Sequence, residues 1–149
     1  MIRTEAEFQE ALRRRDQDRQ LAELQRQELV KRGLTPEAVD RAMEPLLSFQ
    51  AQLEEEIEWY ENARAGNALT INRLTQIGRL LIALRIASGI TQRELAKRLG
   101  VTEAVVSRDE RNEYHGISIE RVQRIVDALQ ASVTTQGAPK QQDLVLCQP

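Results

Sequence analysis

Residues 84–112 read LRIASGITQRELAKRLGVTEAVVSRDERN, and this stretch predicts two short helices joined by a tight turn. Thr91 followed three residues later by Glu94 is a capping box, which begins the first helix. Gly100 supplies the left-handed residue that ends it, and Thr102 caps the second helix. Only Leu99-Gly100-Val101-Thr102 therefore separates the two helices.

The residues around this turn predict how the two helices pack. Ala96 is small, so the second helix can cross closely above the first, and Val101 is expected to fold onto the core. Val106, with Val105 beside it, supplies the inward face of the second helix. This is the pattern of a helix-turn-helix unit. Its second helix, over residues 102–112, keeps an exposed outer face of the size that enters the major groove of DNA.

Two further helices flank this pair. The helix before it ends at Gly89, and its apolar face carries Leu74, Ile77, Leu81 and Leu84. The helix after it is capped by Ser118, and its apolar stripe consists of Ile119, Val122, Ile125, Val126 and Leu129. We expect an all-α fold in which residues 67–130 form a compact domain of four to five helices.

The same residues resemble a known family. The pattern from Leu84-Arg85 through Gly89-Ile90-Thr91-Gln92-Arg93-Glu94-Leu95-Ala96, Leu99-Gly100-Val101-Thr102 and Val106-Ser107-Arg108 to Glu110 is similar to the phage-repressor (Cro/C1, or XRE) helix-turn-helix family of bacterial transcriptional regulators. The resemblance covers roughly residues 72–130. It implies a lambda-repressor-like domain that binds double-stranded DNA.

The resemblance also implies roles for individual residues. Arg85 and Glu110 match a pair that forms a buried salt bridge, and Gln92 matches a residue that holds a DNA phosphate at a helix N-terminus. The positions that face base edges are Glu103, Ala104, Ser107 and Arg108. Of these, Arg108 has the best chemistry for the task, because a guanidinium can bond both O6 and N7 of guanine. The residues expected at the DNA backbone are Thr91, Gln92, Arg93, Thr102 and Arg111, with Lys97 and Arg98 as further candidate cations.

The chain departs from the family pattern at two places. Asp109 stands where the family usually has an apolar or aromatic residue. After Glu110 the family often has glycine, whereas here Gly116 comes later and Asn112 is expected to adopt the left-handed conformation that ends the helix. His115, in the same loop, is interpreted as a hydrogen-bonding residue and not as a metal ligand.

The N-terminal segment, residues 1–66, predicts a helical hairpin. Thr4 with Glu7 begins one helix and Lys31-Arg32-Gly33 ends it, although residues 13–20 contain no apolar residue and therefore indicate a solvated stretch or a break. Thr35 and Pro36 begin the next helix, and Pro45 predicts a kink or a restart. One face of this helix is an apolar seam formed by Leu46, Leu53, Ile57 and Tyr60, with Gln50 within it and Phe49 beside it. The opposite face is acidic and carries Glu54, Glu55, Glu58 and Glu61.

Two interpretations of this hairpin remain open. Its helices either pack on one another within one chain or form a dimer surface, since two helices alone have little core. A hairpin that ends in an acidic-aromatic stretch also resembles the N-terminal extension of some antitoxin-like regulators. Trp59 and Tyr60, taken as exposed, would then contact a partner protein.

Composition and charge exclude several classes of protein. The chain has 149 residues, one Cys and one His, which excludes disulfide frameworks and multi-histidine metal centres. It has no apolar run of membrane-spanning length and no secretory h-region, so we expect a cytoplasmic protein with no membrane contact. Residues 1–70 carry 10 Lys and Arg against 15 Asp and Glu, whereas residues 71–130 carry 10 against 7. Only the second segment has the net positive charge that suits a nucleic acid.

Two functions compete at this point. The first is a dimeric, sequence-specific transcriptional regulator, a repressor, that reads a two-fold-symmetric operator with residues 102–112. The second is an antitoxin or adaptor that binds a partner protein through residues 4–65 and regulates its own promoter. An enzyme is not expected, since no catalytic constellation or phosphate-binding glycine loop occurs, and no cofactor or metal is expected either. Residues 131–149, which include Cys147, are expected to form a flexible tail.

Overall fold

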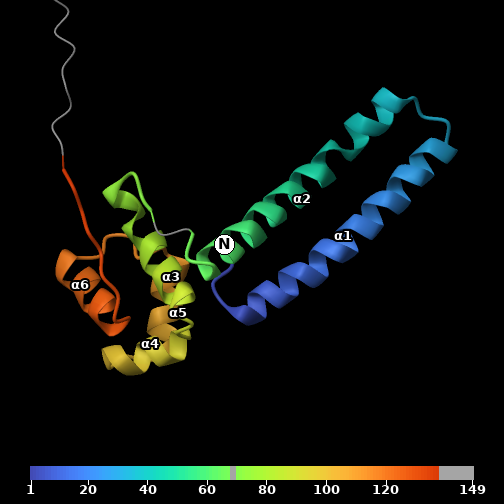
Figure 1. The fold of residues 1–149 in the computed structure, drawn as a ribbon. Coiled ribbons are helices and arrows are strands. Elements are labelled where there is room, and N and C mark those ends of the chain that lie inside the picture. Colours follow the sequence, from blue (N-terminus) through green and yellow to red (C-terminus); the bar gives the residue numbers. More distant parts are fainter. Residues whose placement is uncertain (68–69, 138–149) are drawn as a thin grey trace, which may run out of the picture.

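The computed structural model describes residues 1–67 and 70–137, and within them the fold is all-α, as predicted. A long hairpin projects from a compact bundle of short helices (Figure 1). The elements in chain order are α1 (Glu5–Lys31), α2 (Pro36–Arg64), the 3-10 turn η1 (Leu74–Gln76), α3 (Ile77–Ala87), α4 (Gln92–Leu99), α5 (Glu103–Arg111) and α6 (Ile119–Ala128). The predicted tail falls largely on residues 138–149, Cys147 included, which lie outside the described residues.

Helix α1 is continuous, so the break allowed for in residues 13–20 does not occur. The helix begins with the complete capping box of Thr4 and Glu7. Its polar stretch is solvated and carries ion pairs one turn apart, Arg13 with Glu10 at 2.5 Å and Arg14 with Asp18 at 3.6 Å. A helix whose exposed faces carry no apolar residues can remain intact when ion pairs one turn apart and packing on a neighbouring helix stabilise it.

Helix α2 begins at the predicted Thr35 cap, and Ala38 N–H donates to the Thr35 hydroxyl. It runs through Pro45 without ending, so the predicted restart is wrong. Proline removes one backbone donor and leaves the carbonyl of Arg41 without its helical partner. Both residues lie on the exposed side of α2, where water can satisfy that carbonyl.

The hairpin packs within one chain, which confirms the first of the two interpretations as far as the α1–α2 contact is concerned. The predicted seam lies between the helices, where Ile57 and Tyr60 are buried and Leu46 and Leu53 are partly buried. Near the base of the hairpin the rings of Phe8 and Tyr60 stack with centroids 4.9 Å apart. The far half has a small core of its own, formed by Ala22, Val39 and Met43 with partly buried Leu29, Leu34 and Leu46.

One hydrophobic core joins the base of the hairpin to the helical bundle. Ile2, Phe8, Ile57 and Tyr60 belong to the same buried cluster as Leu81 and the rest of the bundle core. Arg79 on α3 lies over the Trp59 ring, 5.9 Å from its centroid. The hairpin is therefore docked onto the bundle and is not held only by the connection around residue 68.

Three apolar residues predicted to face the bundle core do not. Leu74 is 73% exposed because it lies in η1, ahead of the register of α3, and Ile119 is 77% exposed as the first residue of α6. Val101 is 39% exposed, since the turn leaves its side chain at the surface. The remaining predicted positions of these helices are buried or partly buried.

The loop after α5 also differs from the prediction. Asn112 has φ −90° and is not left-handed, whereas Glu113 and Tyr114 have φ values of 48° and 52°. Tyr114 is buried, and its N–H donates to the carbonyl oxygen of Asp109. Burial of its ring stabilises this unusual backbone, which no residue type in the loop indicated.

Candidate nucleic-acid interface

Helices α4 and α5 form the predicted helix-turn-helix. Thr91 accepts a hydrogen bond from Glu94 N–H at 3.1 Å, and Gly100 ends α4 in the left-handed region with φ 68°. Leu95, Ala96 and Val106 are almost fully buried, so the two helices meet closely at Ala96 as expected. Thr102 stands at the N-cap of α5 without a side-chain capping bond.

A buried polar network fixes α5 against its neighbours. The Glu110 carboxylate, fully buried, accepts hydrogen bonds from Arg85 Nε at 2.5 Å and Arg85 Nη2 at 2.8 Å. Arg85 also donates through Nη1 to the Ile90 carbonyl and through Nη2 to the Arg3 carbonyl. A buried charge pair is tolerable only when its remaining donors and acceptors are satisfied, and here they are.

Gln92 belongs to this network. Its side-chain amide donates to Glu110 Oε2 at 2.7 Å, and the residue is only 8% exposed. The phosphate contact expected of Gln92 stays a prediction. In this structure the side chain ties the first turn of α4 to α5, so it positions α5.

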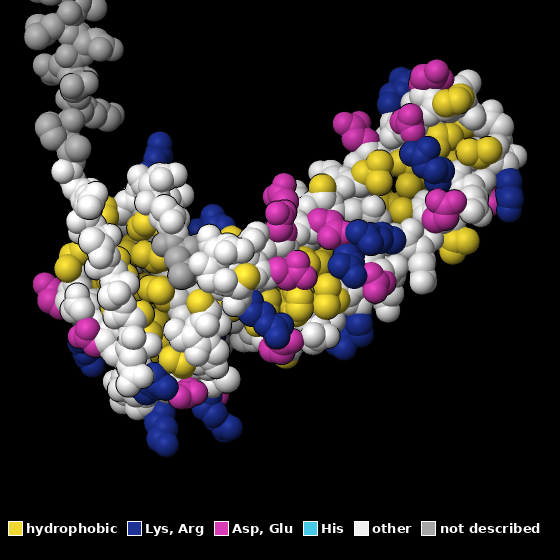
Figure 2. Space-filling model, in the orientation of Figure 1, with side chains coloured by type: hydrophobic (Ala, Val, Ile, Leu, Met, Phe, Trp, Pro, Cys, Tyr) yellow, Lys and Arg dark blue, Asp and Glu magenta, His cyan; other side chains and the backbone are white. Residues whose placement is uncertain are grey.

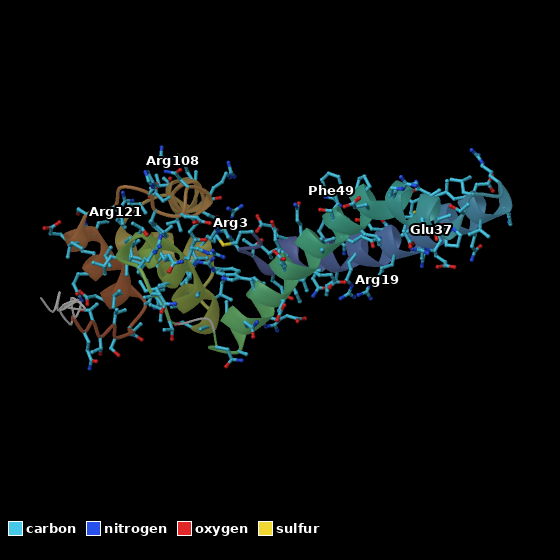
Figure 3. All side chains as sticks on the ribbon, turned by 90° about the horizontal axis from the view of Figure 1, so that it is seen from above. Arg3, Arg19, Glu37, Phe49, Arg108 and Arg121 are labelled. Atoms are coloured by element: carbon cyan, nitrogen blue, oxygen red, sulfur yellow. The ribbon has the colours of Figure 1, made fainter. Side chains whose placement is uncertain are left out.

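The outer face of α5 carries the residues expected at base edges. Arg108 projects from α5 with 74% of its side chain exposed (Figure 3), and Glu103 and Ala104 are also exposed. Ser107 is half-buried. Glu103 lies 3.8 Å from Arg93 Nε, so it partly neutralises a cation of the same surface.

The residues expected at the DNA backbone divide into exposed side chains and one that is bonded within the bundle. Arg93, at 86% exposure, Thr102 and Arg111 are open to solvent, and Lys97 is exposed too. Lys and Arg side chains project from the end of the bundle at which α4 lies (Figure 2). Arg98 is a structural residue instead, because it donates to the Ala128 carbonyl at 2.8 Å and to Glu94 at 2.6 Å.

Sequence reasoning identified Asp109 as a departure but did not identify its partner. Asp109 accepts from Arg121 Nη2 on α6 at 2.5 Å and lies 3.7 Å from Arg108 Nε. The Asp109 side chain is 16% exposed. It thus joins α5 to α6 and holds a negative charge beside Arg108.

Tyr114 is a second residue that sequence reasoning missed. Burial raises the pKa of its hydroxyl above the ordinary value, and the nearby Glu110 carboxylate raises that pKa further. The side chain is therefore neutral at physiological pH and serves as a packing residue under α5. His115 is exposed, and its backbone N–H donates to the Asn112 carbonyl.

The described residues contain neither a metal-binding cluster nor a membrane-spanning helix. No group of three or more His, Cys, Asp or Glu side chains there is placed to hold a metal ion. None of the helices described combines the length and the apolar character needed to span a membrane.

The comparisons with known proteins agree with this geometry. A family model described as Helix-turn-helix matches residues 81–135, which confirms the resemblance to the Cro/C1-type (XRE) family over that segment. Residues 81–135 are accordingly a helix-turn-helix domain of the kind found in DNA-binding regulators. No curated protein and no solved structure matches the chain.

Proposed function

We propose that this chain is a dimeric transcriptional repressor that reads a two-fold-symmetric operator with α5. One observation carries the proposal: the inner face of α5 is locked by the Arg85–Glu110 pair, while Arg108 on its outer face stays exposed. A rigid helix with an exposed guanidinium can enter the major groove and bond a guanine. Binding, and not catalysis, is the proposed activity.

The proposal assigns different tasks to the exposed cations. Arg108 reads a base, with Glu103, Ala104 and Ser107 beside it, whereas Arg93 and Arg111 contact phosphates. One such domain contacts only a few base pairs, so two copies must bind half-sites about one helical turn apart. The modest positive charge of residues 71–130 makes affinity dependent on salt and on the second copy.

Fluorescence anisotropy with fragments of its own promoter, repeated over a range of salt concentrations, tests this function. We expect Arg108→Ala to cost about 1–3 kcal/mol on the operator and to relax base preference at one position. Arg111→Ala should weaken binding to all sequences and reduce the salt slope by about one. Arg13→Ala is the matched control, because this hairpin arginine is 66% exposed and pairs only within α1. If Arg108→Ala binds like the unaltered chain, the assignment of α5 is wrong.

The antitoxin or adaptor function is the second candidate, but one observation that favoured it, the exposure of Trp59 and Tyr60, does not hold. Tyr60 is buried and Trp59 is half-buried beneath Arg79, so these aromatic rings are not an exposed contact surface. The exposed acidic residues Glu55, Glu58 and Glu61 still favour a basic partner protein. Co-purification of such a partner from the source cells, lost on reversing those three charges, is the result expected from this function.

A further inference from the structure

Helix α2 carries a second stripe of residues next to the one that packs on α1. Ala38, Ala42, Pro45 and Phe49 follow one another at spacings of four, three and four, which places them along one face of a helix. We call these four residues the second seam. Phe49 is 66% exposed, and Ala42 and Pro45 are exposed as well.

The second seam lies away from the face of the hairpin that its ion pairs cover. Arg19 pairs with Glu54 at 2.5 Å and Arg26 pairs with Asp40 at 3.0 Å, both across the two helices. Phe49 is five residues before Glu54 and is thus turned from it by about 140°, whereas Leu47, at seven residues, lies on the same side as Glu54. Figure 3 shows Phe49 and Arg19 on opposite sides of the hairpin.

Helix α1 adds apolar side chains beside the second seam. Leu21 and Leu24 are 56% and 63% exposed, and Leu21 lies on the side of the second seam. Leu24 is turned by about 160° from the buried residues Phe8 and Ala22, so it lies at the outer edge of the hairpin. Contacts of Gln50 with the Asp18 carbonyl and of Arg64 with Glu5 fix the register of the two helices. That register places Leu21 at the level of Phe49 and Leu24 at the level of Pro45.

Charged residues frame this apolar patch in a complementary way. On the same register, Arg14 of α1 lies level with Glu56 of α2, and Glu28 of α1 lies level with Arg41 of α2. All four are exposed. Within the chain, three of them have ion-pair partners: Arg14 lies 3.6 Å from Asp18, Glu28 lies 3.1 Å from Arg32, and Glu56 lies 2.8 Å from the N-terminal amine of Met1, so they would exchange or share these partners across the interface. The apolar residues Leu21 and Leu24 lie between Arg14 and Glu28 along α1, and Pro45 and Phe49 lie between Arg41 and Glu56 along α2.

We propose that a second copy of this chain packs on this patch, with α1 of each copy facing α2 of the other. A two-fold axis along the hairpin brings Leu21 onto Phe49, Arg14 onto Glu56 and Glu28 onto Arg41 of the opposite copy, with Leu24 at the edge of the contact. Such an interface is self-complementary, as two-fold symmetry requires, and forms a four-helix bundle. It also puts both helix-turn-helix domains at the same end, where they can reach one duplex. The proposal rests on the dimeric regulator proposed above and adds the surface that makes it dimeric.

Sedimentation equilibrium of the full chain tests the surface with two neighbouring substitutions. We expect a dimer that Phe49→Glu weakens by ~30-fold or more, since a central aromatic anchor is lost and a charge is buried. Leu47→Glu is the matched control, because this apolar residue is 44% exposed on the ion-paired face and should leave the dimer intact. Arg14→Glu should also weaken the dimer, and adding Glu56→Arg should restore it.

The outcomes separate this proposal from the proposed function. A monomeric unaltered chain, an unaffected Phe49→Glu dimer, or equal loss in Leu47→Glu would overturn the surface. DNA binding is then measured by anisotropy on a single half-site. A monomeric Phe49→Glu variant that keeps its base preference on the half-site supports both proposals. If the unaltered chain forms the expected dimer but binds no DNA, the dimer surface is supported and the proposed regulator function is wrong.

Discussion

At the scale of single residues, the site depends on how Glu110 is satisfied. Three N–H groups, two from Arg85 and one from Gln92, point at a carboxylate that water does not reach. The resemblance to a known family implies the Arg85–Glu110 pair from the sequence alone. It also implies a phosphate contact for Gln92. The side-chain amide of Gln92 has two N–H groups, and the sequence contains no signal that one of them bonds Glu110.

Substitution of Asp109 tests whether this side chain positions Arg121 and Arg108. We expect Asp109→Asn to release Arg121 and to remove the negative charge beside Arg108, with a stability loss of only about 0.2–1 kcal/mol because Arg121 is half exposed. Non-specific DNA binding should strengthen, since one charge repelling phosphates is gone, and the operator-to-random affinity ratio should fall. Anisotropy on both DNAs measures that ratio.

Asp127→Asn is the control for Asp109. It makes the same change in net charge on α6, where Asp127 is exposed and accepts a hydrogen bond from Gln123. An equal fall in the affinity ratio for both variants would show that net charge, and not the geometry around Arg108, is responsible.

At the scale of elements, helix ends were predictable and helix continuity was not. Thr4, Thr35, Thr91 and Ser118 each accept the capping bond that their position indicated, because a cap is a local interaction. Helix α1 stays continuous through residues 13–20 and α2 through Pro45, and along this length the two helices are in contact through Gln50 and the Asp18 carbonyl and through the core of Ala22, Val39 and Met43. Such support between distant segments has no local pattern, so both stretches were read as possible interruptions.

Gly78 in α3 shows the same dependence on a distant segment. Alanine usually stabilises a helix interior relative to glycine, by about 0.5–1 kcal/mol. Here a Cβ would overlap the Glu113 carbonyl oxygen in the loop after α5. We therefore expect Gly78→Ala to destabilise the fold by about 1–3 kcal/mol in urea unfolding. Gly137→Ala, whose Cβ would meet nothing within 4 Å, should be near neutral, and a stabilising Gly78→Ala would contradict this packing.

At the scale of the whole molecule, charge and packing divide the chain differently. The acidic residues 1–70 and the basic residues 71–130 predicted a boundary near residue 68. The buried cluster nevertheless runs across it, from Phe8 and Ile57 in the hairpin to Leu81 in the bundle. Local composition indicates surface charge well, but it contains no information on which apolar faces of two segments meet.

This shared core predicts that the hairpin and the bundle unfold together. Phe8→Ala removes the ring that stacks on Tyr60 and should cost about 3–5 kcal/mol, because a buried aromatic side chain leaves a cavity. Hydrogen exchange should show loss of protection in peptides from α6 as well as α2, and far-UV circular dichroism and Trp59 fluorescence should report one coincident transition. Val30→Ala, at a side chain 58% exposed near the tip of the hairpin, should change stability by less than about 0.5 kcal/mol. If Phe8→Ala lowers protection in α2 and leaves α6 unchanged, the two parts are independent units, and the hairpin only tethers the DNA-binding domain.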